Sequence, residues 1–293
     1  MRIAFLGLGN MGAGIAGCIL GAGYDLTVWN RSAAKAEPLI ARGASCAASA
    51  REAVAQADLV ITSLMDDRSV LDVLGSEGGV LAAMKPGAIH LCAATISPAC
   101  ADQLAKLHRE HGTRYVSGPV IGRPDAAAAG QLATYLGGDA QAVQSVRPVC
   151  ESYAKIVVEI SEQPSVANCM KLCANYAAIS MIEVMGETYA FAEKCGVDLQ
   201  YLQQFFQMAF AHPAMKMYAE KVRKRDFTQD VGFAMSAGFK DVRLMLAAAD
   251  QAGVAFEIGR VVERKMLVAL SSDLAAADWS ATCEVTRRES GLS

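Results

Sequence analysis

The first half of the chain alternates short apolar runs with segments of helical periodicity. The apolar runs have the length and composition of buried parallel strands, and they span 3–6, 26–29, 59–64, 89–92, 114–117, 132–136 and 156–160. The segments between them predict helices, which include 49–57, 70–74, 98–110 and 140–151. Strands that alternate with helices build a doubly wound sheet, so this pattern predicts an α/β fold.

Polar residues mark where some of these helices begin. Ser49 precedes one helix, with Glu52 three residues later as a capping box, and Ser97 precedes another. Asp66 and Asp67 are adjacent, and neighbouring residues need not face one site. We therefore interpret this acidic pair as a loop and a helix cap.

The pattern changes at Pro164. From there to Gly196 the sequence predicts one long helix. Strand patterns are absent after it, and helical periodicity recurs at 199–210, 214–225, 233–252, 256–270 and 276–289. We place the boundary near Glu162, which gives an α/β domain at 1–162 and an all-α domain at 163–293 that includes the long interdomain helix.

Composition excludes several classes of protein. The chain has 293 residues, of which 53% are hydrophobic and 19% charged, so it is globular rather than disordered. Its net charge of −3 provides no basic surface for nucleic acid. Residues 3–24 carry no charge, but their seven glycines and the continuation into a strand–helix–strand pattern argue against a signal peptide or membrane span.

Cysteine and histidine usage indicates no metal site. The nine cysteines are odd in number and form no C-x-x-C motif, which predicts small core residues in a reducing, cytoplasmic protein. The four histidines, His90, His108, His111 and His212, show no metal-ligand spacing. We interpret His108 and His111 as a solvated helix end.

A glycine-rich turn joins the first strand to the next helix. Gly7, Gly9 and Gly12 are spaced as G-x-G-x-x-G. Gly7 permits the tight turn, Gly9 lets a pyrophosphate approach the backbone, and Gly12 lets the helix lie close to the strand. The pyrophosphate then meets N–H groups at the helix N-terminus. This context predicts a Rossmann-type dinucleotide site, and a merely glycine-rich turn is the alternative.

The end of the second strand indicates which dinucleotide binds. In NAD sites an acidic residue at this position accepts hydrogen bonds from the ribose hydroxyls. This chain has Asn30, Arg31 and Ser32 at the end of the second strand instead. The Arg31 guanidinium suits a 2′-phosphate, and Ser32 adds a hydroxyl. The sequence thus favours NADP(H), with a solvated loop arginine as the alternative. Met65, Thr95 and the loop 118–130 follow other strands and are placed to contact cofactor and substrate.

Lys171 is the only charged residue between Glu162 and Glu183. Its neighbours are mostly apolar or small, which predicts a helix buried on nearly all faces, with Cys169 and Cys173 in core packing. Burial lowers the pKa of a lysine and suits it to proton transfer near neutral pH. Asn175 follows one turn later on the same face. The alternative is a lysine whose ammonium group reaches water.

These segments resemble the β-hydroxyacid dehydrogenase family, which includes 3-hydroxyisobutyrate dehydrogenases and glyoxylate and succinic semialdehyde reductases. The resemblance runs nearly end to end, and the segments that carry it are GLGNMG at 7–12, WNRS at 29–32, ATISP at 94–98, MKLCAN at 170–175, AEKCGVD at 192–198 and FKDVRL at 239–244.

The resemblance implies an NADPH-dependent oxidoreductase that transfers hydride between the nicotinamide and a small carbonyl or β-hydroxyacid substrate. It implies Lys171 as general acid/base with Asn175 as its helper, and it places Phe233 and Asp241 near the substrate cleft. Taken with the strand ends, this gives expected cofactor contacts at Gly7, Leu8, Gly9, Asn10, Met11, Gly12, Asn30, Arg31, Ser32, Met65, Thr95 and Lys240.

The chain departs from the family pattern at the substrate loop and before the lysine. The family's P-V-S-G is replaced by Pro-Val-Ile-Gly, so Ile121 stands where a serine binds substrate and Gly122 follows. Ser165 and Ala167 stand where glycines are usual. We expect a bulkier or less polar substrate than the small hydroxyacids. Arg123 either holds a substrate carboxylate or forms a loop salt bridge.

Two other functions remain open. The related imine reductases also lack the serine, but they usually replace the lysine, so Lys171 favours a carbonyl reductase. A non-catalytic NADP-binding module would need the glycine turn and Arg31 but no buried lysine. In all cases we expect a small-molecule ligand, no nucleic-acid or membrane partner, and a homodimer or homotetramer formed through the helical domain.

Overall fold

The computed structural model describes residues 1–75, 79–209 and 213–292. It consists of two compact units, Met1–Lys171 and Leu172–Ser293. The division falls inside the long helix α9 (Pro164–Lys194), whereas the predicted boundary at 162 precedes that helix. The first unit has a hydrophobic core on each face of its sheet, and the second unit has one of its own.

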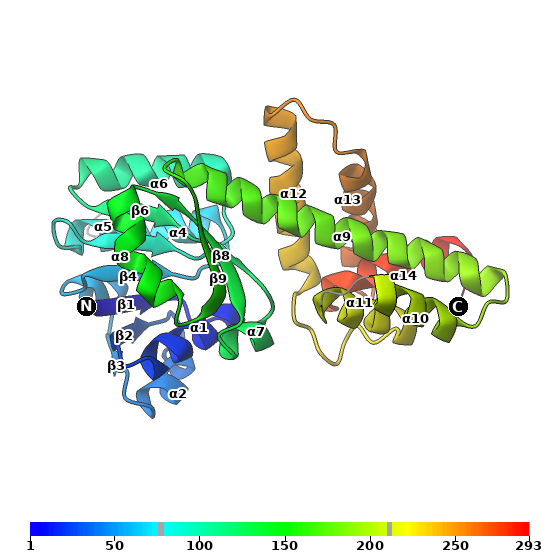
Figure 1. Ribbon diagram of the computed structural model, residues 1–293, viewed down its shortest axis with the longest axis horizontal. Helices are drawn as coiled ribbons and strands as arrows, with labels where there is room; N and C mark the ends of the chain where they lie inside the picture. The colour runs from blue at the N-terminus through cyan, green and yellow to red at the C-terminus, as the bar shows by residue number, and fades with distance from the viewer. Residues whose placement is uncertain (76–78, 210–212, 293) are drawn as a thin grey trace. The chain divides into compact units, whose positions relative to one another are not determined.

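The first unit is organised around one sheet, and nine strands belong to it within the described residues (Figure 1). They are β1 (Arg2–Leu6), β2 (Asp25–Trp29), β3 (Ser45–Cys46), β4 (Leu59–Thr62), β5 (Ile89–Cys92), β6 (Arg114–Ser117), β7 (Val120–Ile121), β8 (Leu132–Gly138) and β9 (Ala154–Ser161). The order is β3-β2-β1-β4-β5-β6-β8-β7, and β9 pairs with β8. Strands β1 to β6 are parallel, which confirms the predicted doubly wound sheet.

Both faces of this sheet are covered because its strands are apolar on both sides. On β1, Ile3 and Phe5 pack in one core with Ile15, while Ala4 and Leu6 pack in another. The first core is covered by α1 (Asn10–Gly21) and α8 (Ala140–Cys150). The second is covered by α3 (Ala50–Val54), α4 (Asp67–Gly75), α5 (Val80–Ala83) and α6 (Pro98–Glu110). The remaining short helices are η1 (Ala33–Ala36), α2 (Glu37–Ile40) and α7 (Pro124–Ala128).

The predicted helix caps are confirmed. Ser49 accepts a hydrogen bond from the Glu52 N–H at 3.1 Å, and Ser97 accepts one from the Cys100 N–H at 3.0 Å. Asp66 accepts the N–H of Ser69 at the start of α4. These caps satisfy backbone donors that the first turn of a helix leaves without partners.

His108 does not belong to a solvated helix end, so that prediction is wrong. Its ring is fully buried and lies 2.9 Å from His90, between Nε2 of His108 and Nδ1 of His90. The chain of hydrogen bonds continues from His90 to Thr62 and from His108 to Thr113, each at 2.8 Å. These partners make burial tolerable for the two rings, whereas His111 is exposed.

The buried histidine pair predicts a pH-dependent stability. Burial lowers the pKa of His90 well below its ordinary value of 6.5, and it lowers the pKa of His108 to about 3. Both rings therefore stay neutral when folded and gain protons on unfolding below pH 6.5. The free energy of unfolding should fall as pH drops from about 7 to about 5, with a slope approaching about 1.4 kcal/mol per pH unit for each histidine.

Urea unfolding of the wild type and of His108→Asn across this pH range measures the effect. In His108→Asn, the slope of the free energy of unfolding against pH should be smaller by the contribution of one histidine. His111→Gln is the matched control, because it replaces an exposed ring that lies outside the buried chain of hydrogen bonds. Equal slopes for the wild type and His108→Asn would contradict the assignment of two neutral buried rings.

The second unit is helical throughout its described residues, as predicted (Figure 1). After α9 it contains α10 (Leu199–Ala209), α11 (Pro213–Lys224), α12 (Met235–Gln251), α13 (Glu257–Leu270), η2 (Trp279–Ala281) and α14 (Thr282–Glu289). The helix predicted at 276–289 begins later, at Thr282. Asp278 explains this difference, because its carboxylate accepts the N–H groups of Ser280 and Phe233 and fixes a turn there. The predicted end at residue 210 lies outside the described residues.

A buried ion pair crosses the core of the second unit. Lys265 on α13 bonds to Glu183 on α9 and to the Thr286 hydroxyl on α14 at 2.6 Å. Lys265 and Glu183 are each only 3% exposed. Glu187 gives Lys265 a second carboxylate at 3.2 Å, and removing Lys265 would leave the buried Glu183 carboxylate without its cation, so we regard this contact as structural.

The prediction that the cysteines are core residues holds for only part of the set. All nine thiols are free, and Cys92, Cys100, Cys150 and Cys283 are buried, but Cys46, Cys169, Cys173 and Cys195 are exposed. Cys169 and Cys173 are four residues apart and share one face of α9, which explains why both are exposed. In the described part of the chain, no helix has the length and apolar character needed to span a membrane.

Candidate active site

The glycine turn between β1 and α1 has a geometry that other residues cannot adopt. Gly7 has a φ of +102°, and a Cβ there would lie 2.4 Å from the Ser63 carbonyl oxygen. A Cβ at Gly12 would lie 2.1 Å from the carbonyl oxygen of Gly7. A Cβ at Gly9 would have no atom within 4 Å, so the backbone at Gly9 faces open space.

This turn fits a dinucleotide pyrophosphate. Gly9 caps α1, and no side chain caps the N-terminus of that helix. Asn10 and Met11 form the first helical turn, where N–H groups lack partners within the helix. Open space above Gly9 and a helix N-terminus together provide what a phosphate group requires.

Asn30 connects the glycine turn to the end of β2. Its Oδ1 accepts the N–H of Leu8 at 2.9 Å, and its Nδ2 donates to the carbonyl of Ser32 at 2.9 Å. The side chain therefore positions the buried Leu8 and the strand end together. Arg31 and Ser32 are exposed beside this contact. Lys35 in η1 is a further exposed cation close after the end of β2 in the sequence. It was not among the predicted site residues, although its position four residues after Arg31 could have indicated it.

Met65 and Thr95 follow neighbouring strands, because β4 pairs with β5 and Thr62 lies opposite Cys92. Met65 is 63% exposed, and Thr95 is half-buried. Asp67 joins the two loops: it accepts the Ser97 N–H at 2.8 Å and the Ser97 hydroxyl at 2.5 Å. The Asp66–Asp67 pair thus divides its roles, since Asp66 caps α4 and Asp67 fixes the segment that carries Thr95.

The predicted substrate loop leads into a helix, α7, that packs against α1. Ile121 ends β7, pairs with Ala133 of β8 and is half-buried, and Gly122 follows with a φ of +142°. Arg123, also half-buried, precedes α7. A Cβ at Gly14 of α1 would lie 2.9 Å from the backbone of α7, so the two helices pack closely.

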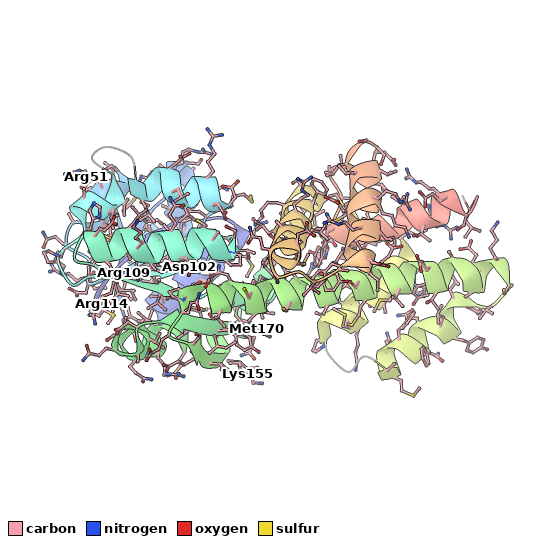
Figure 2. The ribbon with its side chains drawn as sticks, turned by 90° about the horizontal axis from the view of Figure 1, so that it is seen from above. Arg51, Asp102, Arg109, Arg114, Lys155 and Met170 are labelled. Carbon is pink, nitrogen blue, oxygen red and sulfur yellow. The ribbon has the colours of Figure 1, made fainter. Side chains whose placement is uncertain are left out.

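Lys171 lies in the N-terminal part of α9, next to Met170, which Figure 2 labels. Lys171 is half-buried, and Cys169, Cys173 and Ala177 are exposed. The prediction of a helix buried on nearly all faces is therefore wrong. Small and apolar residues on α9 do not by themselves indicate burial, because a folded surface retains many apolar atoms.

The second unit fixes Asn175 with a pair of charged residues. The Asn175 Nδ2 donates to Asp241 Oδ2 at 2.5 Å, and the other oxygen of Asp241 lies 2.6 Å from Lys240 Nζ. Asp241 is 1% exposed and Asn175 is 8% exposed. Phe233 packs edge-on against Trp279, with the ring centroids 4.8 Å apart. This unit therefore brings Asn175, Lys240 and Asp241 together.

The other predicted site residues belong to the first unit. They are residues 7–12, 30–32, 65, 95 and 121–123, together with Lys171. Sequence analysis missed Asn168, which is buried one turn before Lys171 and bonds to Ser117. Its only signal was a polar residue in the largely apolar segment around Lys171. The described residues contain no group of three or more side chains suited to a metal ion, and His212 lies outside them.

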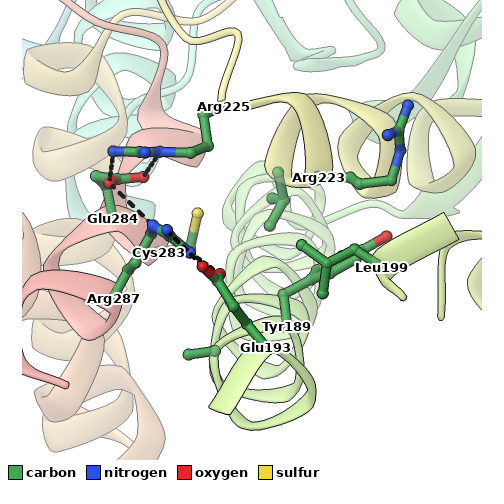
Figure 3. Close-up of a pocket in the computed structure, with 11 residues that line it drawn as sticks. Tyr189, Glu193, Leu199, Arg223, Arg225, Cys283, Glu284 and Arg287 are labelled. Carbon is green, nitrogen blue, oxygen red and sulfur yellow. Dashed lines mark hydrogen bonds and ion pairs between the residues drawn. The ribbon is translucent and has the colours of Figure 1, made fainter. Parts of the chain in front are cut away.

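A separate cavity of about 120 Å³ lies within the second unit (Figure 3). Two of the arginines that line it are engaged: Arg225 bonds to Glu284 at 2.6 Å, and Arg287 pairs with Glu193. Burial raises the pKa of the Cys283 thiol well above its usual range, so that thiol stays protonated. None of the described residues predicted for the active site lines this cavity.

Two family models cover most of the chain. Residues 2–169 match the NAD binding domain of 6-phosphogluconate dehydrogenase, and residues 166–286 match the NAD-binding family of NADP-dependent 3-hydroxyisobutyrate dehydrogenase. The uncharacterized oxidoreductase YfjR of Bacillus subtilis is 35% identical over 96% of this chain and 98% of its own. The NAD-dependent L-serine dehydrogenase of Pseudomonas aeruginosa is 30% identical over 95% of each chain. Glyoxylate/succinic semialdehyde reductase 1 of Arabidopsis thaliana is 28% identical over 98% and 99%.

Solved structures agree with these matches. The Mycobacterium tuberculosis 3-hydroxyisobutyrate dehydrogenase with L-serine has a TM-score of 0.86 and 29% identity, covering 98% of this chain and 100% of its own. The imine reductase of Myxococcus stipitatus with NADP⁺ has a TM-score of 0.68 and 20% identity over 98% and 100%. The second likeness concerns the fold alone.

Proposed function

Because the chain belongs to the β-hydroxyacid dehydrogenase family of NAD(P)-dependent oxidoreductases, we propose that it uses NADPH to reduce a small carbonyl compound, or NADP⁺ to oxidise the corresponding β-hydroxyacid. The observation that carries this proposal is the i, i+4 pair Lys171 and Asn175 on α9, with the Asn175 amide held by Asp241 at 2.5 Å.

The residues of the first unit would hold the cofactor. Gly9 and the N-terminus of α1 would receive the pyrophosphate, and the exposed Arg31 and Ser32 would bind a 2′-phosphate. Exposed Lys35 adds positive charge to the same segment. Met65 and Thr95 would contact the cofactor from the ends of β4 and β5, and we also assign Lys240 to the cofactor.

Lys171 would act as the general acid/base. When bound, the reduced nicotinamide supplies hydride to the carbonyl carbon. Lys171 donates a proton to the oxygen that becomes the hydroxyl, and it accepts that proton in the reverse direction. Asp241 fixes the amide plane of Asn175 one turn later, which lets Asn175 assist Lys171. We place Ile121, Gly122, Arg123 and Phe233 at the substrate.

The test is NADPH oxidation with a panel of purified substrates: succinic semialdehyde, glyoxylate and a cyclic imine. The proposal is supported if a carbonyl compound has the highest kcat/KM of the panel. A preference for the cyclic imine would support the imine reductase alternative, which Ile121 favours because it replaces the family's serine. NADPH binding without any turnover would support a non-catalytic module.

Substrate preference should depend on Ile121. An isoleucine removes one hydrogen bond from a small polar hydroxyacid, about 0.5–1.5 kcal/mol, and offers apolar contact worth roughly 25 cal/mol per Å². Ile121→Ser should therefore shift the ratio of kcat/KM toward 3-hydroxyisobutyrate by about 2- to 10-fold relative to a bulkier, less polar hydroxyacid. Val120→Thr, a substitution at the buried neighbour, is the matched control. A ratio that stays unchanged in Ile121→Ser would remove Ile121 from the pocket.

We also propose a homodimer or homotetramer formed through the second unit. Tyr201, Phe205 and Met208 are 69%, 53% and 77% exposed, and their spacing places them on one face of α10. Such an apolar face is typical of a surface that packs against another copy. Light scattering would show a monomer of 30.9 kDa if this proposal is wrong.

The nine free thiols favour a reducing, cytoplasmic location, which cell fractionation would test.

A further inference from the structure

Asn168 is a buried amide one helical turn before Lys171. It lies on α9 and is only 1% exposed. Burying a primary amide is costly unless its polar atoms find partners. Its two hydrogen-bond partners therefore restrict rotation of this part of α9.

Both partners of Asn168 lie at or just beyond the ends of strands in the first unit. The Ser117 hydroxyl donates to Asn168 Oδ1 at 2.5 Å, and Asn168 Nδ2 donates to the carbonyl of Ile96 at 3.2 Å. Ser117 ends β6, and Ile96 follows Thr95 after β5; both are fully buried. The Ile96 carbonyl can only accept, which fixes the orientation of the amide.

These contacts restrain α9 at the point that matters for Lys171. Residues at i and i+3 lie on adjacent positions of one helix face, so Asn168 and Lys171 turn together. Two hydrogen bonds, one to the Ser117 hydroxyl and one to the Ile96 carbonyl, resist rotation and sliding of the helix better than one. The same amide is tied to the segment that carries Thr95, which is itself fixed by Asp67 through Ser97.

We propose that Asn168 is a positioning residue for the reaction, because it holds the Lys171 turn of α9 against the Thr95–Ile96 segment. This inference rests on the proposed role of Lys171. A displacement of about 1 Å in a reacting group can cost about 100-fold in rate. Asn168→Ala should therefore lower kcat by about 10- to 100-fold, while the Kd for NADPH measured without substrate stays within about 3-fold.

The variants separate positioning from stability. Ser117→Ala removes one of the two bonds and should lower kcat by less than Asn168→Ala does. The double variant should be no slower than Asn168→Ala alone, because both changes break the same contact. Val146→Ala, a truncation in the buried face of α8, controls for destabilisation and should leave kcat unchanged while lowering the melting temperature.

A second readout does not depend on turnover. Reductive ¹³C-methylation gives each lysine an NMR signal, and the signal that disappears in Lys171→Ala is that of Lys171. In Asn168→Ala and Ser117→Ala the chemical shift and titration midpoint of this signal should move, whereas in Val146→Ala they should stay. If Asn168→Ala does not fold, Ser117→Ala provides both the kinetic and the NMR comparison.

The outcomes distinguish this inference from the proposed function. The kinetic assay uses NADPH and the carbonyl compound of the panel that gives the highest kcat/KM. If Lys171→Ala is inactive but Asn168→Ala and Ser117→Ala keep the wild-type kcat and the wild-type Lys171 signal, the positioning role is wrong and the proposed function stands. If Lys171→Ala retains full activity, the proposed function fails and the positioning role fails with it.

Discussion

Replacing Lys171 with alanine should lower kcat by about 10²- to 10⁴-fold and leave the affinity for NADPH nearly unchanged. The expected loss is that of a general acid that protonates the developing alkoxide, a group that contributes this range in enzymes. The glycine turn and Arg31, which we assign to the cofactor, are unaffected by the substitution. Steady-state kinetics with the best carbonyl substrate, together with a fluorescence titration of NADPH, measure the two quantities.

Lys155→Ala is the matched control for this result. Lys155 is an exposed lysine of β9 in the same unit (Figure 2), so its loss changes the net charge equally without touching the proposed site. The control should keep the wild-type kcat. Turnover that survives Lys171→Ala would show that Lys171 is structural, and the proton would then have to come from another group.

Replacing Arg31 with alanine should weaken NADPH binding by about 10- to 100-fold and leave NADH binding nearly unchanged. A charge-assisted hydrogen bond contributes about 1.5–3 kcal/mol, and only NADPH carries the 2′-phosphate that Arg31 would meet. Arg31 is exposed, while neighbouring Asn30 is engaged with Leu8 and Ser32, so the guanidinium can be removed without breaking the turn. Isothermal titration of both cofactors gives the two dissociation constants.

Arg109→Ala on α6 is the corresponding control, since Arg109 is an exposed arginine of the same unit (Figure 2). It should bind both cofactors as the wild type does. An equal loss of NADPH and NADH affinity in Arg31→Ala would instead indicate that Arg31 contacts a part common to both. The proposed preference for NADP(H) would then lack its residue.

The sequence predicted the elements whose signal is local. Apolar runs such as 59–64 identify buried strands because both faces of a parallel sheet are covered, and β4 is found at Leu59–Thr62. Ser49 and Ser97 were identifiable as caps because a cap involves only residues a few positions apart. The glycine turn was identifiable for the same reason, since Gly7 and Gly12 meet each other's backbone.

Contacts between distant segments could not be predicted in this way. His108 is buried because Thr62, His90 and Thr113 satisfy its ring and that of His90, and their positions become neighbours only in the folded sheet. Asn168 is bonded to Ser117, 51 residues earlier in the chain. Antiparallel pairing of β8 with β6 and β7 also has no signature in the alternation of strands and helices.

Deuterium transfer tests the central claim most directly. The enzyme is given NADPH deuterated at the transferring position of the nicotinamide, with the carbonyl substrate that it turns over best, and the product is examined by mass spectrometry and NMR. Direct hydride transfer to a carbonyl predicts one deuterium on the carbon that bears the new hydroxyl group, and Lys171→Ala should form about 10²- to 10⁴-fold less of this product over the same time. Product without deuterium would contradict direct hydride transfer, and deuterium taken up faster from NADPH by the cyclic imine of the panel than by any carbonyl compound would contradict the assignment of a carbonyl reductase.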